Sequence, residues 1–142
     1  MDVDRDLHPD LDAGSGPVST ARRSLVITED LVRAYSRRGN YHSDASQAEK
    51  LGLPGLVAQG TQAMGPAYGL LLDTWGADFL AEGEIDVRFV GMVLANQTVD
   101  ATVAIADDLH DEATIEVSNR DSGRLAVVGT AMRISRGATP AP

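Results

Sequence analysis

The segment from Thr61 to about Trp75 constrains the fold most, because its composition is that of a helix that is apolar on nearly every side. A helix of this kind has to be buried. Polar and apolar residues then alternate, as in strands, over residues 84–90, 98–106, 113–118 and 124–134. An antiparallel sheet wrapped around the helix is the least costly way to bury it. We therefore predict an α+β fold with a long central helix and with these four strands in a meander.

The first part of the chain predicts shorter elements. Residues 24–27 form a β-prone run, and Thr28 is placed to cap a helix that Gly39 stops. A second short helix is expected further on, with Asp44 as its cap. Pro66 lies in the second turn of the central helix, so we expect a distortion there or a later helix start.

Length and composition predict one folded domain. The chain has 142 residues, of which 43% are apolar, and this suffices for one hydrophobic core. Both ends are rich in Gly, Pro or small residues and show no periodicity. We predict a flexible N-terminal arm over residues 1–22, the folded domain over 23–136 and a frayed tail over 137–142.

Composition and charge argue against several classes of protein. The formal net charge of −9 is the wrong sign for a nucleic-acid binder. No apolar run approaches the ~18 residues that a membrane span needs. The acidic N-terminus differs from a signal peptide, so we expect a cytoplasmic protein. The chain has no cysteine and no His or carboxylate spacing typical of a metal site, so we predict neither disulfide nor metal.

Five short motifs follow one another in a distinctive order. They are Thr28–Leu31 at a helix start, Asn40–Asp44 after that helix, Leu53–Gly60 before the central helix, Val87–Val90 on a strand and Val127–Ala131 on the last strand. In this order the chain resembles the MaoC-type hydratases of the hot-dog fold, over about residues 24–135. The resemblance implies reversible addition of water to a trans-2-enoyl thioester on coenzyme A or acyl carrier protein. It implies no metal and no organic cofactor.

The resemblance also implies roles for particular residues. Hydration needs a base–acid pair that holds one water, and donors for the thioester enolate. The family supplies an Asp and, five residues later, a His, in the pattern D-x-N-P-x-H, together with a backbone N–H at the start of the central helix. His42 matches this histidine, and Gly60 and Thr61 match the helix start. We therefore expect His42 and Gly60 to be catalytic and Thr61 to contact substrate.

The aspartate of the family pattern is replaced. Arg37 stands at its position, or Arg38 after a one-residue slip, and an arginine cannot act as a base. Three interpretations stay open. His42 does the acid–base work, alone or with Asp44 or another carboxylate. Arg37 or Arg38 binds a substrate carboxylate or the pantetheine phosphate. Or the pocket has lost hydration and acts on another thioester or a polyketide-like substrate.

Four further residues are candidates for substrate binding: Asn40, Tyr41, Gln59 and Tyr68. Gln59 stands where the family often has histidine, and it either contacts substrate or bonds only to backbone. The tyrosines either present a hydroxyl to the pocket or pack against other side chains. Asn40 belongs to the motif that carries His42.

Two functions remain in competition. The first is an enoyl-thioester hydratase or 3-hydroxyacyl-thioester dehydratase. The second is a non-hydrating hot-dog protein, such as a cyclase or isomerase on a polyketide-like biosynthetic intermediate, or a binding protein; the arginine at the Asp position favours it. We also predict a homodimer or a higher even oligomer, because a single sheet leaves unpaired edges and the family builds its pocket between subunits.

Overall fold

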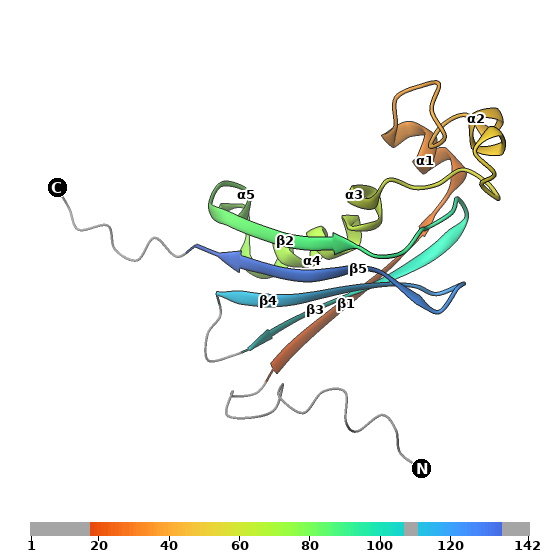
Figure 1. Cartoon of the computed structure of the whole chain (residues 1–142). Coiled ribbons are helices and arrows are strands. Elements are labelled where there is room, and N and C mark those ends of the chain that lie inside the picture. The colour runs from red at the N-terminus through yellow and green to blue at the C-terminus, as the bar shows by residue number, and fades with distance from the viewer. Residues whose placement is uncertain (1–17, 107–110, 135–142) are drawn as a thin grey trace, which may run out of the picture.

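The computed structural model describes residues 18–106 and 111–134 of the chain. Its elements, in chain order, are β1 (Val18–Ile27), α1 (Glu29–Tyr35), α2 (Ala45–Lys50), α3 (Gly60–Ala63), α4 (Gly65–Trp75), α5 (Asp78–Glu82), β2 (Gly83–Phe89), β3 (Gln97–Ala106), β4 (Glu112–Asn119) and β5 (Arg124–Arg133). The strands form one antiparallel sheet, and α4 packs against β1, β3 and β4 (Figure 1). The predicted α+β architecture, a sheet around a central helix, is confirmed.

The inner face of the sheet carries the core, and the alternation in the sequence identifies it. On β3 the odd-numbered residues from Val99 to Ile105 are buried, and on β4 so are those from Ala113 to Asn119. They pack with the apolar side of α4, where Leu71 is fully buried. Every second residue of a strand and every third or fourth residue of a helix faces the same side, and these sides meet in one core.

The predicted four-strand meander is wrong in one respect. The strand order is β1-β3-β4-β5-β2, so that only β3, β4 and β5 follow one another, while β2 pairs with β5 at an edge. The segment 90–96 crosses the end of the sheet instead of turning back. Its backbone bonds to Ala126 near one end and to Ile27 at the other. Alternation of residue type predicts that a segment is a strand but not which strand it pairs with. The strand order therefore could not be predicted from the sequence.

The long central helix is interrupted where the sequence predicted a distortion. α3 ends at Ala63, and α4 begins at Gly65 with Pro66 in its first turn. Proline has no N–H to donate to the carbonyl of Gln62, so the helix cannot run unbroken through this point. α4 alone is the central helix, and α3 is a separate turn that leads into it.

The domain begins earlier in the chain than predicted. β1 starts at Val18, so residues 18–22, assigned above to the N-terminal arm, belong to the sheet and pair with β3. The residue types in this stretch, mostly small or charged, do not indicate a strand. Pairing with β3 makes it one, and the sequence does not show that pairing. The rest of the predicted arm and the predicted tail over 137–142 lie outside the described residues.

The predicted helix caps are confirmed. Thr28 accepts a hydrogen bond from the N–H of Leu31, and Asp44 accepts one from the N–H of Ser46. α1 ends at Tyr35, before Gly39, which has a positive φ of 86° in the turn that follows. Among the described residues no helix has the length and apolar character needed to cross a membrane.

Candidate active site

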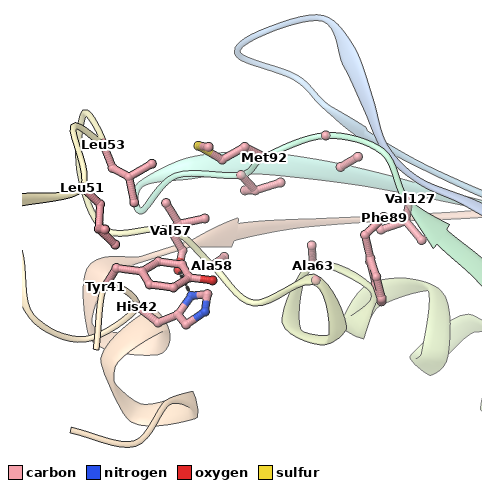
Figure 2. A pocket seen from close by; sticks show the side chains of 14 residues that line it. Tyr41, His42, Leu51, Leu53, Val57, Ala58, Ala63, Phe89, Met92 and Val127 are labelled. Atoms are coloured by element: carbon pink, nitrogen blue, oxygen red, sulfur yellow. Dashed lines mark hydrogen bonds between the residues drawn. The ribbon is translucent and has the colours of Figure 1, made fainter. Parts of the chain in front are cut away.

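A cavity of about 400 Å³ lies between α3, the end of β2 and the loop that carries His42. Its walls are mostly hydrocarbon, from side chains such as Leu53, Val57 and Met92. Figure 2 shows Tyr41 and His42 at one end of the cavity and Phe89 at the other. Tyr41 and His42 are the polar side chains in the lining that the described residues provide. Two larger hollows lie elsewhere, but neither contains a histidine.

The ring of His42 is fixed by one hydrogen bond. Its Nδ1 lies 2.5 Å from the carbonyl oxygen of Val57. A carbonyl oxygen can only accept, so Nδ1 carries a proton, and in the neutral imidazole Nε2 then keeps its lone pair. The imidazole therefore has a basic nitrogen that this bond leaves free, and it is only partly buried. A histidine held in this way is suited to take a proton from a bound water.

The loop around His42 is held by polar side chains rather than by burial. The side-chain oxygen of Asn40 accepts from the backbone N–H of His42 at 3.0 Å. The hydroxyl of Ser43 donates to the carbonyl of Arg37 at 2.7 Å. The backbone of Tyr41 accepts from the N–H of Val57 at 3.5 Å. Asn40 thus holds the backbone of His42, and it does not line the cavity.

Tyr41 lies directly against His42. The two ring centroids are 4.0 Å apart, with 39° between the ring planes. Both side chains line the cavity. The sequence singled out Tyr41 for substrate binding, and the structure places it where a ligand in this cavity would meet it.

The start of α3 borders the same cavity through Gly60. The N–H groups of Gln62 and Ala63 bond to the carbonyl of Gln59, whereas within the described part of the chain no hydrogen bond involves the N–H of Gly60 or Thr61. These two amides are therefore open donors at a helix start. Gly60 lines the cavity and Thr61 does not, and the enolate-binding role that the resemblance implied for this helix start stays a prediction.

Gly60 is also a position where a side chain does not fit. A Cβ built there would lie 2.5 Å from the ring of Phe89. Phe89, at the end of β2, therefore packs directly over the start of α3 and closes one end of the cavity (Figure 2). The sequence analysis assigned no role to Phe89, although it lies in one of the motifs quoted above. Only the packing of β2 against α3 reveals its place in the site.

Gln59 and Thr61 tie the start of α3 to the end of α1. Gln59 donates from Nε2 to the hydroxyl of Ser36 at 2.7 Å, and Tyr35 donates from its hydroxyl to that of Thr61 at 2.9 Å. Neither Gln59 nor Thr61 lines the cavity. Their side chains position the helix start, and their predicted contacts with substrate remain predictions.

Arg37 and Arg38 do not lie in the cavity that contains His42. Neither Arg37 nor Arg38 lines the cavity, and both are exposed. Arg38 instead borders a separate hollow of about 540 Å³ together with Arg33 and Ser43. Tyr68 lies on α4, is 42% exposed and does not line the cavity either. The substrate-binding roles of these residues therefore stay predictions without a common site.

Asp44 does not supply a carboxylate to the cavity. It accepts hydrogen bonds from the N–H of Ser46 at 2.9 Å and from its hydroxyl at 2.7 Å. The hydroxyl bond and then the N–H bond from Ser46 lower the pKa of this carboxyl. Asp44 borders the same hollow as Arg38. In the described residues, no carboxylate lines the cavity that holds His42.

Comparison with known proteins places the chain in a family. A model of the MaoC-like domain matches residues 15–124. No curated protein matches the chain. Among solved structures, an (R)-hydratase from A. caviae involved in PHA biosynthesis superposes with a TM-score of 0.66 at 19% identity, covering 86% of this chain and 96% of that one.

Two further structures are similar. R-hydratase PhaJ1 from Pseudomonas aeruginosa gives a TM-score of 0.64 at 19% identity, over 81% of this chain and 79% of that one. A C-terminally truncated HadBC complex, a (3R)-hydroxyacyl-ACP dehydratase from Mycobacterium tuberculosis, gives a TM-score of 0.58 at 22% identity. The superposition covers 83% of this chain and 96% of that one. At these identities the likeness shows the fold, which is the predicted hot-dog fold, and the family match extends over most of the sequence. The chain is a member of the MaoC-like domain family.

Proposed function

We propose that this chain is a hydratase/dehydratase that acts on an enoyl or 3-hydroxyacyl thioester. The observation that carries the proposal is the arrangement of His42. Its Nδ1 is bound to the carbonyl of Val57, so Nε2 is free to act as a base in the cavity that Gly60 also borders. A base and open amide donors at one apolar cavity are what addition of water to a thioester requires.

The chemistry follows from these groups. His42 takes a proton from a water through Nε2 while the water oxygen attacks the β carbon of the enoyl thioester. The electron pair of the double bond moves toward the thioester carbonyl and forms an enolate. The N–H of Gly60, at the edge of the cavity, stabilises its oxygen, because charge is greatest there in the transition state. Protonation of the α carbon completes the addition.

The hydrocarbon lining supports an acyl substrate. A cavity of about 400 Å³ is of a size suited to a small organic group, and its walls offer few polar partners to any other kind of ligand. The carrier is coenzyme A or acyl carrier protein. The hollow that contains Arg33 and Arg38 lies outside the cavity and is a candidate for the phosphate of the pantetheine arm.

A homodimer belongs to the same proposal. β1 and β2 are the two edge strands of the described sheet. Phe89, Val90 and Met92, at the end of β2 and beyond it, are each more than half exposed. Apolar side chains beside an unpaired edge favour burial against a second copy. Sedimentation is expected to give a dimer or an even multiple of it, and a stable monomer at micromolar concentration would contradict this.

The second candidate function is a cyclase or isomerase on a biosynthetic intermediate, or a binding protein. One observation favours it: no carboxylate lines the cavity within the described residues, although the family pattern has an aspartate. Proton transfer without hydration would need His42 but not a second group that holds water.

Hydration of crotonyl thioesters tests the proposal. Loss of absorbance at the conjugated-enoyl band is expected with the purified protein, on coenzyme A or on acyl carrier protein. His42→Ala is expected to lower the rate by roughly 10²- to 10⁴-fold, the usual loss of a general base. Leu80→Ala is the matched control, because Leu80 is 67% exposed and outside the cavity. Absence of turnover at every chain length, with the fold intact by circular dichroism, would favour the second candidate.

A further inference from the structure

Within the described residues, no carboxylate lines the cavity beside His42. Hydration takes a proton from water and delivers one to the α carbon. His42 alone would have to do both from one ring position, whereas a second group lets the two transfers occur at separate atoms. Asp44 is engaged as a helix cap outside the cavity, and Arg37 and Arg38 do not line it. In the part of the chain that the structure describes, the polar side chains of the lining are His42 and Tyr41.

Tyr41 is held in the place that a second group would need. Its ring centroid lies 4.0 Å from that of His42, and the backbone of Tyr41 accepts from the N–H of Val57, whose carbonyl binds Nδ1 of His42. Val57 thus contacts Tyr41 through the Tyr41 backbone and His42 through its ring. Figure 2 shows the Tyr41 hydroxyl pointing inward beside the imidazole.

The hydroxyl of Tyr41 is available for this task. Among the described residues the Tyr41 hydroxyl makes no hydrogen bond, whereas the hydroxyl of Tyr35 donates to Thr61. A phenolic O–H can donate a proton as well as a hydrogen bond. The ring of Tyr41 lies against the imidazole at 39° between the ring planes, and Tyr41 is 37% exposed, so its hydroxyl is reachable from the cavity and from solvent.

We propose that Tyr41 is the second catalytic group of this site and that its phenol protonates the α carbon. The inference rests on the proposed function. His42 Nε2 takes a proton from water, the C–O bond forms at the β carbon, and the π electrons of the C=C bond become the enolate. The O–H of Tyr41 then gives its proton to the α carbon, which leaves a phenolate. The imidazolium of His42 returns its proton to that phenolate, so that one water is added and both residues are restored.

A conservative substitution tests this role. Tyr41→Phe keeps the ring against His42 and removes only the hydroxyl, so the fold and the stack are expected to persist. We expect kcat for crotonyl-thioester hydration to fall by roughly 10²- to 10⁴-fold, with KM within about twofold of the wild type. Leu80→Ala is the control, because Leu80 is 67% exposed and lies outside the cavity, and it is expected to leave kcat unchanged.

The pH profile separates catalysis from a structural role. If the phenol donates, the rate falls as the pH rises through its pKa. Fluorotyrosine at position 41 lowers the phenol pKa, and the alkaline limb should move to lower pH by the same amount. The limb should be absent in Tyr41→Phe. A merely structural tyrosine would not move it.

The outcomes are distinct for the two proposals. Loss of activity in His42→Ala together with full activity and an unchanged alkaline limb in Tyr41→Phe overturns the role of Tyr41 and leaves the hydratase function standing. A wild-type protein that hydrates no enoyl thioester overturns both. A loss of kcat in Tyr41→Phe, with the shifted limb in the fluorotyrosine protein, supports the role.

Discussion

The sheet with α4 and the segment over residues 36–63 are stabilised in different ways. The sheet and α4 bury apolar side chains against one another, and Leu71 and Ile115 are almost completely enclosed. The segment 36–63 is mostly half-buried or exposed and is held by hydrogen bonds from polar side chains, such as Asn40 to His42 and Gln59 to Ser36. Burial gives the sheet and α4 stability but little chemistry. The polar bonds of the segment give less stability and place the reactive groups.

The largest effect on stability is expected in the core. Leu71→Ala removes a fully buried side chain from α4 and leaves a cavity between helix and sheet. The free energy of unfolding should fall by about 2–5 kcal/mol. Leu80→Ala, at 67% exposure, should change it by no more than about 0.5 kcal/mol. Urea denaturation of both variants checks the prediction, and equal losses would contradict the contrast between core and surface.

A second prediction concerns the point where the two regions meet. Gly60→Ala would bring a Cβ within 2.5 Å of the Phe89 ring, so ring and helix start must separate. We expect a loss of about 1–3 kcal/mol from overpacking and a lower hydration rate, because the amides of Gly60 and Thr61 move.

Two variants make this prediction sharp. Gly55→Ala is the control, since a Cβ there meets nothing within 4 Å. Adding Phe89→Ala should relieve the strain of Gly60→Ala, which a double-mutant cycle detects as a coupling free energy. Purely additive losses in the cycle would show that the contact between Phe89 and Gly60 does not limit the substitution.

A smaller loss of stability is expected when the hydrogen bond between Asn40 and the backbone of His42 is removed. Asn40→Ala removes the acceptor of the His42 N–H and leaves that donor unpaired, at a cost of about 1–3 kcal/mol when buried and less at this partly buried site. Asn40→Asp keeps an acceptor at the same place and should lose less stability. Chemical denaturation ranks the three proteins, and equal stability of Asn40→Ala and the wild type would show that the bond contributes nothing.

The smallest effect is expected on the outer face of the sheet. Asp100 accepts from Arg120 at 2.6 Å and from the hydroxyl of Ser24 at 2.5 Å, and first the Arg120 bond and then the Ser24 bond lower the pKa of Asp100 to about 2. A carboxyl whose folded pKa is lowered stabilises the fold above its unfolded pKa, and this contribution is lost as the pH falls through about 2.

The measurement compares the wild type with Asp100→Asn. At pH 7 the variant should be less stable by no more than about 1 kcal/mol, because the Arg120 side chain is 59% exposed. The difference should shrink from about pH 4 downward and vanish below the folded pKa. Glu116→Gln, on the same exposed face and with no ion pair among the described residues, should show a smaller dependence. A difference that grows toward low pH would contradict the sign.

Part of this molecule could be predicted from its sequence because the signals are local. Alternation predicted the strands β2 to β5, Thr28 and Asp44 were placed correctly as caps, and Pro66 predicted the break between α3 and α4. Caps, breaks and periodicity depend on neighbours a few residues away. The order of the quoted motifs predicted the family and the hot-dog fold.

Only the tertiary structure decided how these elements meet. The pairing of β2 with β5 rather than β3, the start of β1 at Val18 and the contact of Phe89 with Gly60 join residues far apart in the chain. The same holds for the cavity, which contains Tyr41 beside His42 and leaves Arg38 in a different hollow. Residue type and spacing specify what each segment can form, whereas the position of a side chain relative to a distant one is set by how helices and strands pack.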